Sequence, residues 1–461
     1  MEDDGFDDNV AVRKRIIGIL AGIGMNVNNV IGSGIFTTPG MVWKSLNSPQ
    51  AAMILWAIGG IISMAGSLTY AELGASINRS GGESAYLKVA YTKPKNFISY
   101  LFSFMFIVAI RPGSISAVLQ AVAQYLWYII SDDASELNSK KGWESGWPFW
   151  RLKLISIITL AIITGYHMYS TRLANYINQT FAVIKMMVLT IIAIAGLVKL
   201  PSVLSTHPNN WLDPIEATRG FKDFSFSFIL VDLLVNVAFI SVVPRELIID
   251  IEEFNEVIAA DFFMNLFGKK AGRILSLFII ISAIGTAASM TWSGSRVLAY
   301  AAQLDYIPYF SEQLKWKATE NSPKFALLAQ FIWCSLLIVL VGGGISSDSF
   351  ILFSNFSQYS AWIFYMLTGI GLLSLRYYTS RYRLFKIPNP IVCLFVLGGV
   401  YISIFSYFVE VTCPTNEPKC DLKHQSLKRQ APYFISLGFL VLGTICYYFA
   451  IYRVSKNNEI E

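Results

Sequence analysis

A run of polar and small residues interrupts the first long apolar stretch of the chain. Residues 16–43 carry no charge, and at 1.5 Å per residue they are long enough to cross the ~30 Å hydrocarbon core of a bilayer. The middle of the stretch reads Asn-Asn-Val-Ile-Gly-Ser-Gly over residues 28–34, and each glycine inside a helix costs about 1 kcal/mol relative to alanine. We therefore predict a membrane helix that is broken near its midpoint.

The chemistry that such a break offers is the capture of a charged ligand by backbone groups. Backbone left unpaired in lipid costs several kcal/mol per group, so a break at this depth is tolerated where it lines a cavity or binds something. The amide groups and the positive dipole end that follow a break suit a carboxylate. The alternative is that Gly32 and Gly34 are flexible or form a small-residue packing face, since glycine is common in membrane helices.

Two ionisable residues inside other apolar runs leave alternatives open. Arg111, followed by Pro112, lies within the run at residues 97–130. It either lines the protein interior or marks a helix end and extends to the interface. His167 lies near the end of the run at residues 152–170, where it is either a proton relay or a histidine hydrogen-bonded within the bundle.

The composition places these residues in a polytopic membrane protein. The chain has 461 residues, of which 54% are hydrophobic and 14% charged, with a mean hydropathy of +0.51, whereas a soluble domain carries about 25% charged residues. The net charge of +6 does not indicate nucleic acid as a partner, because the basic residues occupy short loops where they orient helices. We predict an all-α membrane helical bundle that forms one domain in the lipid bilayer.

The apolar runs predict about eleven membrane-spanning helices by length. Residues 1–12 are expected to be a disordered cytoplasmic N-terminus, residues 13–453 the transmembrane domain and residues 454–461 a cytoplasmic tail. The segment 257–267 is too short to cross and is expected to be interfacial or re-entrant. The predicted spans are residues 16–43, 51–77, 97–130, 152–170, 176–199, 224–243, 271–302, 325–341, 350–375, 387–411 and 432–452.

The basic residues disagree with this number of crossings. The clusters at residues 13–15 and 79–95 with Arg172, and those at residues 315–317 and 376–386, all have the charge expected of cytoplasmic loops. If residues 224–243 cross the membrane once, with no further helix before them, the clusters before this segment and those after it cannot all lie on the cytoplasmic side. Either that segment does not cross, or one helix is missing just before it.

Several motifs in order give the chain a family resemblance. They are VIGSGIF at residues 30–36, YAEL at 70–73, SGGESAYL at 80–87, RPGS at 111–114, VNVAFISVVPRE at 235–246, WSGSR at 292–296 and the run 349–376 with its basic tail. With these motifs the chain resembles the L-type amino acid transporter family of the amino acid–polyamine–organocation superfamily. The strongest likeness is to the fungal branch that includes methionine permeases.

The resemblance implies twelve helices in the LeuT-like inverted-repeat fold, alternating access and an amino acid as substrate. It implies that the amide groups of Gly32, Ser33 and Gly34 hold the substrate carboxylate. It also implies that the carbonyls of Val30 and Ile31 meet the amine. The family's sixth helix has no counterpart, because residues 222–228 pass almost directly into the counterpart of the seventh. About 11 of the 12 helices are therefore expected, as the basic residues also indicate.

The residues near the break favour a neutral substrate side chain, possible choices being methionine or other large neutral amino acids. Ile35 and Phe36 follow the break directly, and by resemblance Tyr359 and Trp362 belong to the cavity wall. The alternative for the last two is packing against lipid or within the bundle. No metal site, cofactor or catalytic residue is expected.

Cysteines bear on partners and orientation. In animal relatives a cysteine after the third helix bonds to a single-span heavy chain, but residues 131–150 contain none, so no covalent heavy chain is expected. Cys413 and Cys420 share a polar loop that we predict faces outside, where a disulfide could form. The resemblance implies a plasma membrane location.

Three hypotheses follow for the function. The first is a carrier of neutral L-amino acids, with exchange and proton coupling both open; Glu72, Asp232 and His167 could bind the proton, although a structural role is the alternative for each. The second, motivated by the missing helix, is a non-transporting or truncated relative that acts as a sensor or regulatory protein. The third, a membrane-embedded enzyme, is disfavoured because the chain has three histidines and no HExxH motif.

Overall fold

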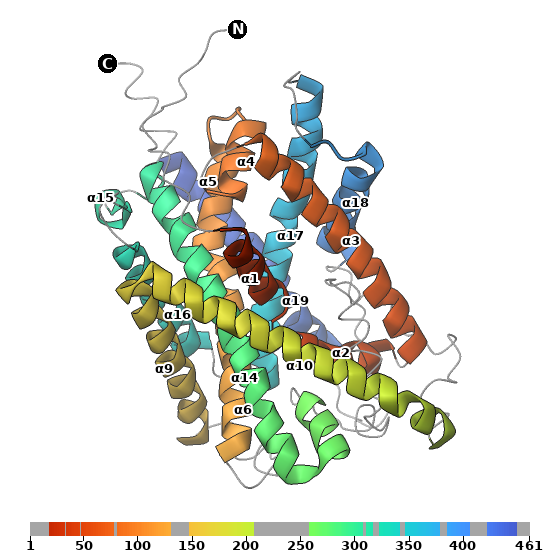
Figure 1. Ribbon diagram of the computed structural model, residues 1–461. Coiled ribbons are helices and arrows are strands. Elements are labelled where there is room, and N and C mark those ends of the chain that lie inside the picture. Colours follow the sequence, from red (N-terminus) through yellow and green to blue (C-terminus); the bar gives the residue numbers. More distant parts are fainter. Residues whose placement is uncertain are drawn as a thin grey trace, which may run out of the picture.

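The computed structural model is a bundle of helices (Figure 1). It describes residues 18–32, 34–46, 48–77, 81–130, 147–206, 258–307, 310–316, 322–341, 346–378, 385–405 and 422–449. Every regular element in this part of the chain is a helix, and six helices there are long and apolar enough to cross a membrane. The predicted all-α polytopic bundle is thereby confirmed.

Several predictions concern residues outside these ranges. They are the two terminal segments, Ser33, the loop at residues 131–146, the span at residues 224–243 with Asp232 and the junction before it, and the cysteine pair at 413 and 420. The predictions for these residues remain predictions.

The first part of the chain forms the broken helix and the two long helices that follow it. Ser48 accepts a hydrogen bond from the amide of Ala51, and Pro49 occupies the first position of the next helix, which is a favourable helix start. The elements are α1 (Ile19–Val30), α2 (Gly34–Leu46), α3 (Pro49–Ser76), α4 (Glu83–Ala90), α5 (Phe97–Met105), the π-helix η1 (Phe106–Ile110) and α6 (Arg111–Ile130).

The second part contains most of the remaining spans. Gly268 interrupts α14 with a φ of 81°, so the short apolar segment before it is a separate helical piece ahead of the long span. The elements are α9 (Trp147–Tyr169), α10 (Thr171–Thr206), α14 (Ile258–Gln303), α15 (Ser311–Leu314), α16 (Lys324–Val341), α17 (Ser346–Tyr378), α18 (Asn389–Phe405) and α19 (Leu422–Tyr447).

Among the described helices, the start of the last one differs most from its prediction. The last span was expected to start at residue 432, but α19 begins ten residues earlier and holds Pro432 in its interior. The residues before the proline are Leu, Lys, Gln and Arg in the main, which favour helix although most of them are polar. A membrane helix also tolerates proline, because neighbouring groups can satisfy the freed backbone.

Helices α6 and α14 form the centre of the bundle. α14 packs extensively against α6, and α10 crosses α14 with α1 beside it (Figure 1). The largest hydrophobic cluster joins this centre to the segment after the break through fully buried side chains such as Phe36, Tyr125 and Phe262. The break is therefore held against the centre of the bundle.

A π-helix precedes Arg111 for an identifiable reason. Pro112 has no amide hydrogen, so the helical hydrogen bond to the Val108 carbonyl is missing, and the indole of Trp333 donates to that carbonyl at 2.9 Å instead. The helix continues through this point, and the Arg111 guanidinium lies over the Phe106 ring at 4.7 Å. Of the two alternatives for Arg111, the structure supports the interior position.

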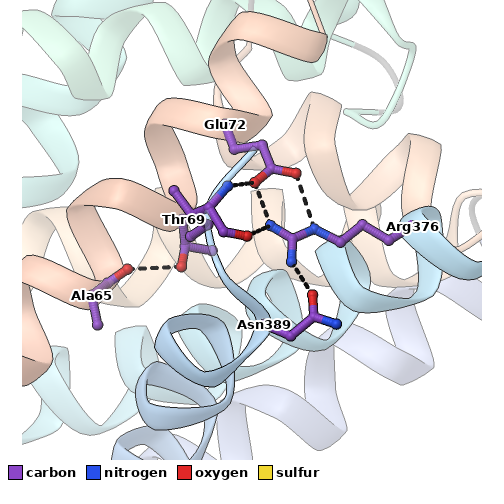
Figure 2. A network of polar contacts seen from close by, with 6 residues as sticks. Ala65, Thr69, Glu72, Arg376 and Asn389 are labelled. Carbon is purple, nitrogen blue, oxygen red and sulfur yellow. Dashed lines mark hydrogen bonds and ion pairs between the residues drawn. The ribbon is translucent and has the colours of Figure 1, made fainter. Parts of the chain in front are cut away.

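A buried ion pair joins α3, α17 and the start of α18 (Figure 2). Arg376 Nε donates to one oxygen of Glu72 at 3.0 Å, and Nη2 pairs with the other oxygen. The Ile387 amide donates to the same carboxylate at 2.9 Å, while Arg376 also donates to the Ile387 carbonyl and to Asn389. Glu72 is fully buried and its carboxylate is matched by these donors, so its role is structural.

Candidate functional site

The first apolar stretch is broken at the predicted place. α1 ends at Val30 and α2 begins at Gly34. Between them Ile31 has φ −91° and ψ 86°, and its amide still donates to the Val27 carbonyl at 2.9 Å. Gly32 forms the bend, and Ser33 lies outside the described residues.

The break brings two helix ends of opposite polarity within a few residues of each other. The last carbonyls of α1 and the first amides of α2 have no partners within their own helices. The macrodipole places partial negative charge at the first end and partial positive charge at the second. The pair of ends therefore suits a small zwitterion, with its cationic group toward α1 and its anionic group toward α2.

A lysine of α10 already occupies the α1 end. The Lys185 ammonium group donates to the Asn28 carbonyl at 3.3 Å, to the Ile31 carbonyl and to the Thr286 hydroxyl at 2.9 Å. Its side chain is fully buried, and these three acceptors match its three hydrogens. The negative end of the helix dipole thus compensates the buried charge.

Helix α14 contributes hydroxyl groups to the same end of α1. The Thr286 hydroxyl lies 3.2 Å from the Ile31 carbonyl, and Ser289 donates to the Met25 carbonyl at 3.1 Å. A Cβ placed on Gly32 would lie 3.3 Å from a Thr286 methyl group. Gly32 therefore also packs closely against α14. The alternative of a small-residue packing face thus holds for Gly32 together with the break.

A third contact fixes α1 against α10. The Asn28 amide group donates to the Asn178 carbonyl at 2.6 Å, and both side chains are fully buried. Side chains of α10 and α14 thus bind the backbone of the C-terminal half of α1. In return, the Asn28 side chain of α1 binds the backbone of α10. A movement of α1 would break these contacts together.

Lys185 is the main residue of the site to which the sequence assigned no role. The available signal was a lysine inside an apolar run, which is costly unless it has an interior function. The Ile31 carbonyl is expected to meet the substrate amine, but it already accepts hydrogen bonds from Lys185 and Thr286. The structure places Val30, Ile31, Gly32 and Gly34 at the break.

The aromatic residues expected in the cavity wall have different surroundings. The Tyr359 hydroxyl donates to the Ser403 carbonyl at 3.2 Å, and its ring contacts Tyr433. Trp362 packs against Phe395 in a hydrophobic cluster between α3, α17 and α18. For both residues the structure supports the alternative of bundle packing, whereas Ile35 and Phe36 are buried beside the break.

His167 has a local partner. One of its ring nitrogens, Nδ1, lies 2.8 Å from the Ile163 carbonyl of the same helix, and the side chain is buried. This geometry supports the alternative of a histidine hydrogen-bonded within the bundle.

Comparison with known proteins gives a family match and similar relatives. A family model described as amino acid permease matches residues 17–231 and 224–420. The b(0,+)-type amino acid transporter 1 of Mus musculus is 24% identical over 95% of this chain and 88% of its own length. The high-affinity methionine permease of Saccharomyces cerevisiae is 23% identical, with shares of 86% and 73%. The human large neutral amino acids transporter small subunit 2 is 24% identical, with shares of 97% and 82%.

The two stretches that match the family model overlap at residues 224–231. This is the place where the sequence predicts that a helix is absent. The alignment with the mouse relative runs over 477 positions while covering 95% of a 461-residue chain. The relative therefore has residues at positions where this chain has none, as expected if the chain lacks internal residues of the family.

Proposed function

Because this chain belongs to the amino acid permease family, we propose that it carries neutral L-amino acids across a membrane by alternating access. It is a multi-pass membrane protein, and its family and relatives are permeases and transporters rather than enzymes. The observation that carries the finer proposal is the break between α1 and α2, with its carbonyl end and its amide end in proximity.

The substrate carboxylate is assigned to the amide end of the break. The amides of Gly32, Ser33 and Gly34 precede or begin α2, where the positive dipole end favours an anion by about 0.3–2 kcal/mol. The residues that follow in α2, Ile35 and Phe36, are apolar and buried. A neutral substrate side chain fits these surroundings better than a charged one.

The substrate amine is assigned to the carbonyls of Val30 and Ile31. Lys185 and Thr286 already reach the Ile31 carbonyl, so a bound amine would share or replace those contacts. Substrate binding and the attachment of α1 to α10 and α14 are then linked, because both use the same end of α1. Such a link is what alternating access requires of a binding site.

Two further features belong to this proposal. The names of the relatives favour methionine or another large neutral amino acid as substrate. The location is a plasma membrane, and no covalent heavy chain is required, because residues 131–150 contain no cysteine.

The second candidate is a non-transporting relative with a sensing or regulatory role. It is favoured by the overlap of the two family matches at residues 224–231, where the sequence predicts that a family helix is missing. Uptake of labelled methionine or leucine in a permease-deficient cell separates the two candidates. Uptake above that of the empty host supports the carrier. Background uptake with the protein at the cell surface supports the second candidate.

A pair of glycine variants tests the place of binding. Gly22 and Gly32 lie on the same segment, but a Cβ at Gly22 meets nothing within 4 Å, whereas one at Gly32 meets Thr286 at 3.3 Å. Gly32→Val should abolish uptake at unchanged surface expression, because the bend and its contact with α14 cannot accept the side chain. The matched Gly22→Val variant should retain uptake. Equal uptake by both variants would show that the break is not part of the binding site.

A further inference from the structure

An arginine of α6 lies inside the bundle without a closed ion pair. The Arg111 guanidinium lies over the Phe106 ring at 4.7 Å, and its Nε is buried without a hydrogen-bond partner among the described residues. The charge of Glu83 acts on Arg111, but no carboxylate in the described part of the chain forms an ion pair with it. Charged side chains inside a membrane bundle are costly unless they are paired, so a further group that balances Arg111 is expected.

A glutamine of α16 lies beside Arg111 and also lacks partners. A Cβ placed on Gly294 of α14 would lie 2.5 Å from Gln330 Nε2 and 2.9 Å from Arg111 Cγ, so the two side chains meet over the same point of α14. Gln330 is 7% exposed, yet both polar atoms of its amide are without a hydrogen bond to any residue that the structure describes. Buried polar atoms of this kind are uncommon and indicate a bound water or ion.

A neighbouring contact fixes the two side chains relative to each other. Trp333, one turn after Gln330 on α16, donates to the Val108 carbonyl at 2.9 Å, and Val108 lies one turn before Arg111. Residues three apart share a helix face, so one face of each helix carries both contacts. Gly294 permits this arrangement, because a side chain there would collide with the Gln330 amide nitrogen.

The two side chains offer hydrogen-bond donors beside a positive charge. Arg111 Nε has one hydrogen and the Gln330 amide nitrogen has two, and both nitrogens lack an acceptor among the described residues. A water molecule would accept these bonds but leave the charge unbalanced in the low-dielectric interior. An anion satisfies both needs through charge-assisted hydrogen bonds. Arg111 keeps partial exposure, so a small ion can reach the guanidinium.

We propose that Arg111 and Gln330 form a binding site for a small monovalent anion, with Gly294 as the residue that lets the two side chains meet. The ligand is chloride or a carboxylate, which share the single negative charge and the acceptor capacity that the site requires. The ion would join α6 to α16 beside α14, so its binding stabilises the bundle. The inference does not rest on the proposed function, because binding and stability are measured without transport.

Melting temperatures of the purified full chain in detergent test the site. Sodium isethionate, the salt of a larger sulfonate, is replaced at constant ionic strength by sodium chloride in one series and by sodium acetate in another. A ligand that binds the folded state raises the melting temperature as its concentration exceeds its dissociation constant. We expect a saturable rise for the wild type and none for Arg111→Gln, and the anion that produces the rise identifies the ligand as halide or carboxylate.

The matched control is an arginine that also lies over an aromatic ring but is exposed. Arg151 of α9 lies over the Trp127 ring at 5.2 Å and is exposed. Arg151→Gln should keep the full rise in melting temperature, because the anion is held elsewhere. This control separates binding at Arg111 from a general effect of the salt on a positively charged protein.

A second variant keeps the test decisive if Arg111→Gln does not fold. Gln330→Leu retains the charge and removes one donor group, so half-saturation should require about tenfold more anion. An unchanged response in Gln330→Leu overturns the site. It is also overturned by equal responses of the wild type and Arg111→Gln, or by a wild type that responds to neither anion. Background amino acid uptake with an intact anion response overturns the proposed function and leaves this site standing.

Discussion

Lys185 shows how a single residue stabilises an irregular backbone inside a bundle. The carbonyls of Asn28 and Ile31 would be left without partners at the end of α1, and the lysine satisfies both while Thr286 accepts its third hydrogen. The break is therefore a compensated structure, with a cation supplied by the protein itself at its negative end.

Replacement of this lysine should be costly. Lys185→Met leaves two buried carbonyls without their donor, so we expect the free energy of unfolding to fall by about 1–3 kcal/mol and amino acid uptake to be lost. Thermal unfolding in detergent measures the first effect. Lys315→Met is the control, because Lys315 pairs with the exposed Glu312 and exposed pairs contribute about 0–1 kcal/mol. Equal effects of the two variants would contradict the role of Lys185.

Glu83 gives a pH dependence whose sign can be derived. Its pKa is raised in the folded protein, so between the ordinary carboxyl pKa and the raised value the folded state binds more protons than the unfolded state. Stability therefore falls as pH rises through this window. In Glu83→Gln that fall should be smaller, as measured by melting temperature against pH. Parallel curves for wild type and variant would show that Glu83 does not titrate there.

Residue roles could be predicted where the signal is local. The break is visible because two asparagines and two glycines fall within the seven residues 28–34. The partners of Lys185 are 157 and 101 residues away in Asn28 and Thr286, so the sequence shows a lysine in an apolar run without showing what it binds. The resemblance places Tyr359 and Trp362 in the cavity wall, but the neighbours of an aromatic residue depend on which face of α17 meets which helix.

At the scale of helices, the ion pair at Glu72 joins three elements at one point. α3, α17 and the start of α18 have a shared hydrophobic cluster of Leu73, Leu372 and Ile387 around it. A buried pair with all its hydrogen bonds made tolerates the loss of one partner poorly, because the other charge is left uncompensated.

The variants of this pair should show non-additive effects. Glu72→Gln should lower the free energy of unfolding by about 3–5 kcal/mol, and Arg376→Met by a similar amount. The double variant Glu72→Gln with Arg376→Met should be less destabilised than the sum of the two single variants, since it leaves no buried charge unpaired. Denaturation in a double-mutant cycle measures the coupling, and additive effects would show that the two side chains act independently.

Helix positions could be predicted from apolar length more reliably than helix ends. Hydropathy predicts that the last span starts at residue 432, because polar residues precede it, yet α19 begins at Leu422. Polar helix-forming residues can extend a membrane helix beyond the apolar core, and hydropathy does not register this extension. The π-helix before Arg111 has a local cause, the missing amide hydrogen of Pro112. The indole that binds the freed Val108 carbonyl belongs to Trp333, which is distant in sequence.

At the scale of the whole molecule, the chain belongs to the amino acid permease family, and its sequence predicts that one family helix is missing near the middle. Without reference to any relative, the basic residues predict either that residues 224–243 do not cross or that one helix is missing just before them, and the two family matches overlap at residues 224–231. The helices described here nevertheless form the break and its attachment to α10 and α14. The carrier proposal therefore depends on whether this part of the molecule binds an amino acid.

Binding of the carboxylate to the break can be measured directly on the purified full chain by thermal stabilisation with L-methionine and with L-methionine amide. The two ligands share the amine and the side chain, and a ligand that binds the folded state raises the melting temperature as its concentration exceeds its dissociation constant. We predict that methionine raises the melting temperature and that the amide, which has no carboxylate for the amide groups at Gly32–Gly34, does not. Equal stabilisation by the two ligands, or none by methionine, would contradict the account.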